Sequence, residues 1–407
     1  MQTRISARYR DTRQGLEAER ILRACVHCGF CTATCPTYQL LGDELDGPRG
    51  RIYLIKQLLE GGEVSAKTQT HLDRCLTCRS CETTCPSGVQ YGRLVDIGRE
   101  LVEAEVPRPA GARLTRWLLR RVLPYPARFA PLLALGRLAR PLLPAALRRK
   151  VPVAQSAGAR PASGHARRML VLEGCAQSVA MPATNAATAR VLDRLGITLV
   201  TPRGAGCCGA VSQHLAAPAE ALGFVRRNID AWWPHIEAGA EAIIITASGC
   251  GAMVKEYAHL LKDDPDYADR AARVTALAKD IAEVLRDEPL PKERLKPQRR
   301  RIAFQSPCTL QHGQQLAGVV EGILTRAGFT LTPVADAHLC CGSAGTYSIL
   351  QPGLSQRLRD NKLAALGKGA PEVIATANIG CQLHLATGTD TPVRHWIELL
   401  DEAFADR

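Results

Sequence analysis

Short apolar runs alternate with helical patterns in the C-terminal part of the chain. The runs lie at 169–172, 243–246, 302–304 and 373–376. Apolar residues at helical spacing follow at 185–195 and 315–327. Short buried strands that alternate with helices are typical of a parallel α/β sheet with both faces covered. We therefore predict an α/β fold for 167–407, with a long helix over 267–286 between its two halves.

The N-terminal part has helical patterns and no alternating strand pattern. Residues 14–24 carry apolar side chains at helical spacing. A Gly-Pro-Arg-Gly turn signal at 47–50 precedes a second such run at 52–59. We predict that 1–105 is a helical domain.

One cysteine pattern occurs twice in this helical part. It reads C-x2-C-x2-C-x3-C-P, and its copies at 25–36 and 75–86 lie fifty positions apart. In bacterial ferredoxins three of these thiolates hold one [4Fe–4S] cluster, and the fourth ligates the other cluster. We therefore assign Cys25, Cys28, Cys31 and Cys85 to cluster 1, and Cys75, Cys78, Cys81 and Cys35 to cluster 2. The pattern favours a helical two-[4Fe–4S] ferredoxin domain, with its motifs at 14–47 and 66–95, over the small β-rich ferredoxin.

Zinc is the alternative metal for clustered cysteines. Structural zinc takes four ligands, commonly as two C-x2-C pairs separated by a longer loop. Here four cysteines fall within one short segment, and the segment is repeated. This spacing favours two iron–sulfur clusters over zinc.

A second cysteine pattern shows that the α/β part is duplicated. The first copy has Cys175, Cys207, Cys208 and Cys250, and the second has Cys308, Cys340, Cys341 and Cys381. The first and second cysteines are 32 positions apart in both copies, and a glycine follows each adjacent pair. We predict two cysteine-cysteine-glycine (CCG) repeats, at 167–290 and 291–407.

The repeated cysteines follow the predicted strands. Open α/β sheets place their sites beyond the carboxyl ends of strands, so these thiols are candidates for a further iron–sulfur cluster or redox site. Gly204, Gly206 and Gly209 also match the G-x-G-x-x-G nucleotide pattern. The second copy keeps the cysteines but not these glycines, which argues against a nucleotide site.

Charge and composition limit the classes of function. The net charge of +13 resides almost entirely in 101–168, where fourteen Arg and Lys face only Glu103 and Glu105. No nucleic-acid-binding module is visible, so we expect no nucleic-acid partner. No apolar signal-peptide segment and no transmembrane run are recognisable, and sixteen cysteines in a reducing compartment indicate metal or redox chemistry rather than disulfides.

The basic segment is the expected connector, 106–166. Residues 113–123 could form an amphipathic helix, and 132–150 repeats its composition with breaks at Pro141 and Pro144. Two interpretations stay open: a linker whose leucines pack on a neighbouring domain, and a contact of Arg113, Arg116, Arg120, Arg121 and Trp117 with an anionic membrane surface.

The two ferredoxin motifs followed by two CCG repeats resemble the family of glycolate oxidase iron–sulfur subunits. The resemblance covers the whole chain and is most specific at 21–53, 75–89, 246–251 and 339–347. It implies an electron-transfer subunit of a 2-hydroxy-acid oxidoreductase. Flavin would sit on partner subunits that oxidise glycolate to glyoxylate, with quinone as acceptor and a peripheral position at the cytoplasmic side of the bacterial inner membrane. No catalytic residue is expected on this chain.

Other functions remain open at this point. They are a subunit of a related lactate or glycerol-3-phosphate dehydrogenase, a thiol–disulfide or quinone reductase acting at the CCG repeats, and a zinc-stabilised scaffold. The distant heterodisulfide reductase type ends each repeat in C-x2-C. Here the final cysteine is replaced by Met253 in the first copy and His384 in the second. His384 is therefore a candidate ligand, although a lone histidine is more often structural.

Overall fold

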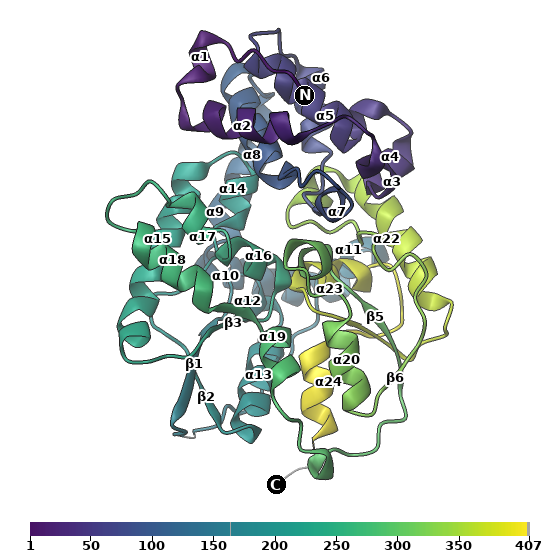
Figure 1. Cartoon of the computed structure of the whole chain (residues 1–407). Coiled ribbons are helices and arrows are strands. Elements are labelled where there is room, and N and C mark those ends of the chain that lie inside the picture. The colour runs from purple at the N-terminus through teal and green to yellow at the C-terminus, as the bar shows by residue number, and fades with distance from the viewer. Residues whose placement is uncertain (163, 405–407) are drawn as a thin grey trace.

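The computed structural model describes residues 1–162 and 164–404. Its N-terminal part is helical, as expected (purple and blue, top of Figure 1). The helices are α1 (Ala7–Arg10), α2 (Arg13–Ala24), α3 (Phe30–Ala33), α4 (Pro36–Leu41), η1 (Glu44–Asp46), α5 (Pro48–Leu59), α6 (Ala66–Asp73), α7 (Ser80–Thr83) and α8 (Tyr91–Glu105). The helices predicted at 14–24 and 52–59 are confirmed as α2 and α5.

Local signals set the ends of these helices. The Thr12 hydroxyl accepts a hydrogen bond from the Gly15 N–H at 3.0 Å and caps α2. Pro36 and Pro48 are the first residues of α4 and α5, where a missing N–H costs nothing. The apolar faces of α2, α5 and α8 are buried against one another and form the core of this part.

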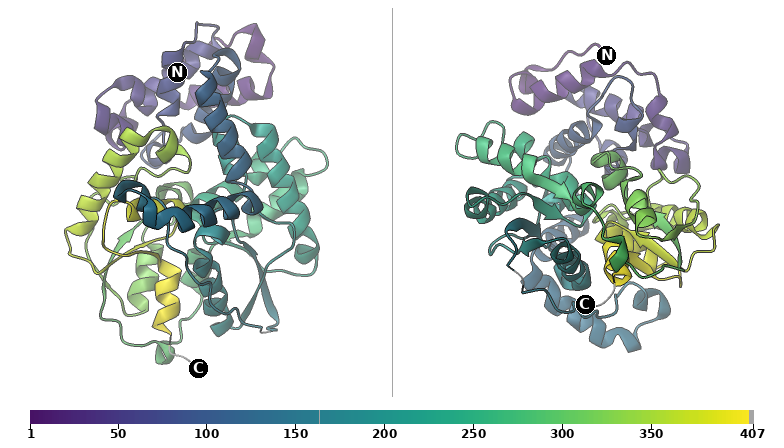
Figure 2. Two further views of the ribbon diagram at one scale, coloured as in Figure 1. Left: turned by 180° about the vertical axis from the view of Figure 1, so that it is seen from behind. Right: turned by 60° about the horizontal axis from the view of Figure 1, so that its bottom comes forward.

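The connector is helical and packed. It contains α9 (Ala110–Val122), α10 (Pro126–Ala139), η2 (Arg140–Leu142) and α11 (Ala145–Arg148). Seen from behind, α9 descends from the N-terminal part and α10 crosses the back of the molecule (Figure 2). The second helix begins earlier than the predicted 132–150 because Pro126 starts α10, and it ends before Pro141 and Pro144, where a break was expected.

The orientation of α9 differs from the sequence-based interpretation of a basic outer face. Arg116 lies 2.9 Å from Asp73 of α6 and is largely buried, and Arg120 lies 3.3 Å from Glu220 of the first repeat. Trp117 is exposed instead. Arg116 and Arg120 of α9 thus turn inward, because their acidic partners lie there, and apolar side chains such as Trp117 face outward. Within 1–162 and 164–404, no helix combines the length and the apolar character needed to cross a membrane.

The first repeat forms a parallel α/β sheet. Its elements are β1 (Arg167–Leu172), α12 (Gln177–Ala180), α13 (Pro182–Arg194), β2 (Ile197–Val200), α14 (Ala210–His214), α15 (Pro218–Glu237), β3 (Ile243–Ile245), α16 (Ser248–Val254), α17 (Tyr257–Leu260), α18 (Ala268–Leu277), β4 (Ala278–Asp280) and α19 (Ile281–Asp287). The short η3 (Lys292–Arg294) leads into the second repeat.

The second repeat has the same design. Its elements are β5 (Arg301–Gln305), η4 (Thr309–Gly313), α20 (Val319–Arg326), β6 (Thr330–Leu331), α21 (Tyr347–Leu350), α22 (Pro352–Gly367), β7 (Val373–Thr376), α23 (Ile379–Ala386), β8 (Val393–His395) and α24 (Trp396–Ala403). The strand orders, β2-β1-β3-β4 and β6-β5-β7-β8, are equivalent, and every pairing is parallel. The predicted duplication and α/β fold are confirmed.

Two predicted helices have different bounds. The helix expected at 267–286 is interrupted by β4, whose Ala278 pairs with Ile243 of β3. Asp280 then caps α19 by accepting from the Ala282 N–H at 3.0 Å. The helix expected at 315–327 starts only at Val319, because Gln315 and Gly318 adopt left-handed backbone conformations (φ 59° and 78°).

The two repeats share one core. Side chains of both sheets and of α13, α19, α20 and α24 form a single buried cluster, which includes the fully buried Trp396. In Figure 1 these helices stand between the two sheets. His395 adds a polar tie, since its Nε2 lies 2.9 Å from the carbonyl oxygen of Thr246 in the other repeat. The repeats therefore form one packed unit beneath the N-terminal helices.

Candidate iron–sulfur centres

The two ferredoxin-type loops have the same backbone shape. His27 and Gly29 in the first loop, and Thr77 and Arg79 in the second, all have left-handed conformations, with φ of 60°, 87°, 52° and 59°. The same two positions of each motif carry this turn, although only one of the four residues is glycine. Three non-glycine residues held in this unfavourable region indicate that the surrounding structure imposes the shape of the loops.

Each loop contributes its last cysteine to the other thiol set. Cys25, Cys28, Cys31 and Cys85 line one cavity of about 30 Å³, which Cys81 also reaches. Cys35, Cys75, Cys78 and Cys81 line a second cavity of about 20 Å³. The thiols thus lie in the two groups of the crossed assignment, while their ligation of clusters stays a prediction.

Hydrogen-bond donors point at one sulfur of the second set, Cys75 Sγ. The Thr77 N–H and the Tyr91 hydroxyl lie 3.4 Å and 3.5 Å from Cys75 Sγ. The Thr37 hydroxyl lies 3.3 Å from Cys35 Sγ and donates its proton to the Asp46 carbonyl at 2.8 Å. Donors to sulfur stabilise thiolate and tune the potential of a cluster. These residues fit an anionic iron–sulfur group.

The spacing of the thiols disfavours zinc. A tetrahedral zinc with bonds of about 2.3 Å to sulfur needs sulfurs about 3.8 Å apart. Among the described residues, no three cysteines have sulfurs that all lie within 4.8 Å of one another; the one group that meets this limit is Asp43, Asp46 and His71. The thiol sets are wider than a single metal ion requires.

Buried thiols need a cation to ionise. Burial, with a smaller effect of the neighbouring thiols Cys25 and Cys85, raises the pKa of Cys31 to about 11. Burial also raises the pKa of Cys81. A bound iron core would supply the positive charge that favours the thiolates.

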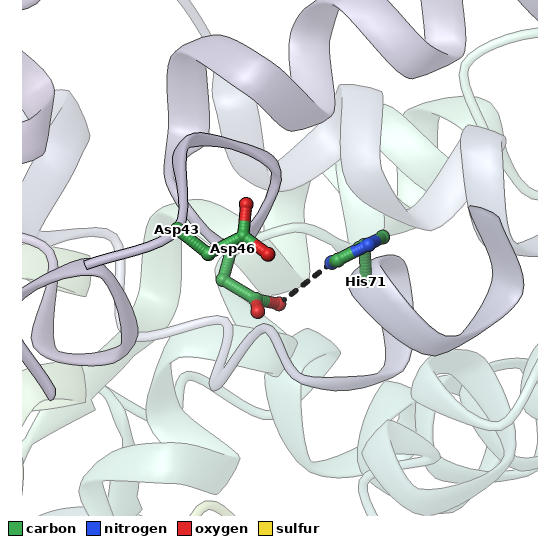
Figure 3. Close-up of side chains that lie close together, drawn as sticks. All are labelled: Asp43, Asp46 and His71. Carbon is green, nitrogen blue, oxygen red and sulfur yellow. Dashed lines mark hydrogen bonds and ion pairs between the residues drawn. The ribbon is translucent and has the colours of Figure 1, made fainter. Parts of the chain in front are cut away.

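The Asp43, Asp46 and His71 group is an ion-pair network rather than a metal site (Figure 3). Asp46 accepts from Arg74 at 2.7 Å and contacts Arg51 at 3.5 Å, and His71 Nδ1 lies 3.0 Å from the same carboxylate. The Asp43 carboxylate accepts from the Leu45 N–H and caps η1. Two guanidinium groups already compensate Asp46, so a divalent cation would face them directly.

Arg51 connects this network to the second thiol set. Its side chain is 1% exposed, and its guanidinium donates to the hydroxyl of Thr37, which lies 3.3 Å from Cys35 Sγ. It also donates to the carbonyl of His71 at 2.7 Å. A fully buried arginine with these bonds fixes the loop and places positive charge beside the second thiol set.

The CCG turns have matching geometry in both repeats. Gly209 and Gly342 have φ of 93° and 85°, and their N–H groups lie 3.4 Å from Cys207 Sγ and Cys340 Sγ, respectively. A Cβ at Gly342 would meet the carbonyl oxygen of Ser355 at 2.4 Å. Glycine is required here by conformation and by space.

Each repeat gathers its four cysteines. A hydrogen bond that it donates to Cys207, together with burial, raises the pKa of Cys175, and a hydrogen bond donated to Cys340, together with burial, raises the pKa of Cys308 in the same way. All four thiols of the second repeat are buried, and three of the four in the first. Both groups have the thiol count of a [4Fe–4S] site.

The second repeat lies against the second ferredoxin-type thiol set. Cys78, Cys308 and Cys340 belong to one hydrophobic cluster with Leu76 and Tyr347. Cys308 is the thiol whose charge raises the pKa of Cys78 most, after the effect of burial. The first repeat has a different environment: Cys175 and Cys207 pack against Tyr125 and Phe224.

Several residues that sequence reasoning missed shape this region. Lys362 is 2% exposed, donates to the carbonyls of Asp336 and Ala337, and lies near all four thiols of the second repeat. Asn378 accepts from the Gly249 N–H at 3.3 Å and donates to Cys381 Sγ at 3.5 Å. A lysine and an asparagine carry no motif, so only their spatial position reveals them.

Two other candidates have structural roles. His384 Nε2 lies 3.0 Å from the Ser355 hydroxyl, which donates to the Gly342 carbonyl, so His384 supports the CCG turn. In the glycine-rich loop, the Gly206 N–H donates to the Asn228 side chain at 2.9 Å. That amide is not free to hold a phosphate.

Two ferredoxin-type thiol sets joined to a duplicated cysteine-rich α/β unit define the class of multi-centre iron–sulfur proteins. The 4Fe-4S dicluster domain family matches residues 21–89, and the Cysteine-rich domain family matches 169–255 and 302–386. These matches support iron–sulfur cluster binding.

Relatives narrow the class. The glycolate oxidase iron–sulfur subunit of Escherichia coli (strain K12) is 61% identical over 404 residues, which are 99% of either chain. The probable glycolate oxidase iron–sulfur subunit of Bacillus subtilis (strain 168) is 31% identical and covers 90% of this chain and 88% of its own. Lactate utilization protein A of Geobacillus kaustophilus is 29% identical over 53% of this chain and 90% of its own. The chain belongs to the family of glycolate oxidase iron–sulfur subunits, which supports an electron-transfer role within an oxidoreductase complex.

Proposed function

We propose that this chain carries electrons from a flavin-containing partner subunit that oxidises glycolate to glyoxylate, and delivers them toward quinone. The observation that supports this most strongly is the packing of Cys78 against the buried cluster that contains Cys308 and Cys340. It joins the ferredoxin-type part to the second repeat without an intervening layer of protein.

The chemistry divides between subunits. A 2-hydroxy acid gives up two electrons as a hydride, which an organic cofactor has to receive first. Iron–sulfur clusters, when bound, pass electrons one at a time. The residues of this chain hold and tune such clusters, and its proposed ligands are the eight cysteines of the two crossed sets. Flavin and substrate therefore belong to the partner.

The face around cluster 1 is the proposed electron-accepting end. Cys28 is exposed, and so are the apolar side chains of Val26, Tyr53 and Phe30, the last being 60% exposed. An apolar patch around an accessible cluster ligand suits the small interface of a redox partner. Electrons would enter here and leave from the opposite end of the thiol path.

The second repeat is the proposed delivering end. Its four thiols, Cys308, Cys340, Cys341 and Cys381, would hold a further cluster, with the Lys362 ammonium beside them favouring the reduced, more negative form. In the first repeat, Cys175 and Cys207 pack against Tyr125 and Phe224 rather than against a thiol of the ferredoxin-type part, and the neutral Asn228 lies near the CCG turn. We therefore assign the route to the second repeat.

The connector is the proposed peripheral membrane contact. Leu118, Leu135, Leu138 and Leu142 are exposed on its outer side, Leu142 at 89%. Exposed arginines, among them Arg113, surround them. Leucines flanked by arginines suit the boundary between acyl chains and anionic headgroups.

Paired substitutions in the two repeats test the route. In the assembled complex, Cys340→Ser with Cys341→Ser should abolish glycolate-driven quinone reduction and leave reduction of a dye by the flavin subunit intact. The matched control, Cys207→Ser with Cys208→Ser in the first repeat, should retain quinone reduction. Equal quinone reductase activity in both double variants and wild type would contradict the proposal.

A further inference from the structure

A cavity of about 480 Å³ lies where the N-terminal helices meet both repeats. Its walls come from α2, α8, α14, α16 and η4, and α8 and α14 lie side by side in Figure 1. One wall residue is a thiol, Cys78 of the second thiol set. Two others adjoin a thiol in sequence: Gly249 precedes Cys250, and Thr309 follows Cys308. The cavity thus lies next to the second ferredoxin-type thiol set and to one thiol of each repeat.

The charges of the wall compensate one another. Glu256 lies 2.9 Å from Arg79 and 2.8 Å from Arg93. Glu17 lies 2.8 Å from His259. Arg13 pairs with Asp263 at 3.0 Å, outside the wall, Asp96 pairs with His214, and Glu100 is hydrogen-bonded to Gln14. Because the cations described in this wall are all paired, it favours a neutral ligand over a carboxylate or a nucleotide.

The remaining wall suits a ring with an apolar substituent. Ile97, Leu222, Met253 and Leu260 supply apolar surface. The volume falls within the range of small-molecule sites, about 300–1,000 Å³. A cavity of this size and lining accommodates a substituted aromatic or quinonoid ring.

Two polar groups of α14 remain available to such a ring. The side-chain oxygen of Gln213 is buried and has no hydrogen-bond partner among the described residues. His214 Nδ1 lies 3.1 Å from the carboxylate of Asp96, which orients the imidazole and leaves Nε2 for a ligand. His214 can donate a hydrogen bond to the carbonyl oxygen of a quinone, and the Gln213 oxygen can accept one from the hydroxyl of the quinol.

We propose that this cavity binds the headgroup of a quinone, an inference that rests on the proposed electron-transfer function. Quinone accepts two electrons, delivered singly from the iron–sulfur path behind Cys78 and Thr309, and two protons, to give quinol. His214 Nε2 donates one proton to the carbonyl oxygen next to it and is reprotonated from solvent, while water supplies the second proton to the carbonyl oxygen on the opposite side of the ring. The Gln213 oxygen accepts the hydroxyl of the product. The contact of α14 with α9 places the cavity one helix away from the exposed leucines of the connector.

Binding of a quinol analogue to the intact complex tests the cavity. Leu222→Trp fills the apolar wall and should weaken binding of heptyl-hydroxyquinoline N-oxide, followed by its fluorescence, at least about tenfold. Leu16→Trp introduces the same side chain on an exposed position of α2 and should leave binding unchanged. Binding that is equal in both variants overturns the proposed site.

A second variant tests the proton donor. His214→Gln should lower quinone reduction about 100-fold, while electron transfer to a one-electron dye persists. Unchanged quinone reduction in His214→Gln overturns the role of His214. If wild-type complex reduces dye but no quinone, the proposed function fails; if it reduces quinone and Leu222→Trp does so equally well, only the cavity assignment fails.

Discussion

Lys362 is buried beside the thiols of the second repeat, whereas the neutral Asn228 lies near the CCG turn of the first. A buried ammonium near four thiols stabilises negative charge on whatever they bind. Lys362→Gln should lower the reduction potential of the site in the second repeat by an amount on the order of 100 mV. Lys368→Gln removes an exposed charge from the next turns of the chain and should leave the potential unchanged. A potentiometric titration in which both variants match wild type would contradict this role.

His395 gives a pH dependence to stability. Burial lowers its pKa to about 4, whereas an unfolded histidine titrates near about 6.5. Between these values the unfolded chain binds a proton that the folded chain does not, so this contribution to stability is complete above the higher value and declines as the pH falls. Asp280 acts in the opposite direction, since burial raises its pKa to about 7. A variant that lacks only His395 therefore has to be compared with wild type to separate the two contributions.

His395→Gln removes the titrating group and keeps an amide donor. The difference in free energy of unfolding between wild type and this variant should shrink by about 1 kcal/mol between pH 7.5 and pH 5.5. Urea unfolding at both pH values measures it. A difference that does not change with pH would show that His395 titrates normally.

At the residue scale, the sequence predicted what depends on spacing. The sixteen cysteines were found because ligand chemistry fixes their separations, and their side chains lie in groups of four. Arg51, Lys362, Asn378 and His214 were missed, because a buried cation or amide gains its role from neighbours that are remote in sequence. No local pattern marks such residues.

At the scale of elements, the CCG turn is the most constrained feature. Gly342→Ala places a Cβ against the Ser355 carbonyl and adds left-handed strain, which should destabilise the fold by about 3 kcal/mol or more. Gly345→Ala shares the positive φ of 62° but meets nothing within 4 Å, and should cost only about 1 kcal/mol. Equal unfolding free energies for the two variants would contradict a steric role for the turn.

The connector helices give an element-scale test of membrane contact. Leu138→Glu with Leu142→Glu should weaken binding of the complex to anionic liposomes at least about tenfold, because two leucines each lose roughly 1.5–3 kcal/mol of burial. Leu16→Glu, exposed on α2, is the control. If the complex with the connector variant co-sediments with liposomes as wild type does, the connector is a protein-docking surface or a plain linker.

Strands and helices were predictable where their apolar pattern was long or repeated. The orientation of α9 was not, since an amphipathic helix does not reveal whether its charged face meets solvent or the acidic side chains of Asp73 and Glu220. The strand β4 was hidden for a similar reason: only pairing with β3 separates it from its flanking helices.

At the scale of the whole molecule, the thiols form a path from one exposed loop to a junction of three parts. The cluster 1 loop faces outward, the cluster 2 thiols lie beneath it, and the second repeat and the 480 Å³ cavity meet at Cys78 and Thr309. Duplication supplied two similar α/β units, and the thiols of the second one contact those of the ferredoxin part. We therefore propose that electrons leave the ferredoxin-type part through the second repeat and not through the first.

Iron content and paramagnetic spectra of the anaerobically purified chain are the sharpest test of the proposed route. Cys340→Ser with Cys341→Ser should lose about four irons relative to wild type and one set of signals, while the signals of the two N-terminal clusters remain. The same iron content and the same spectra in wild type and variant would contradict a redox centre in the second repeat, and with it the proposed route.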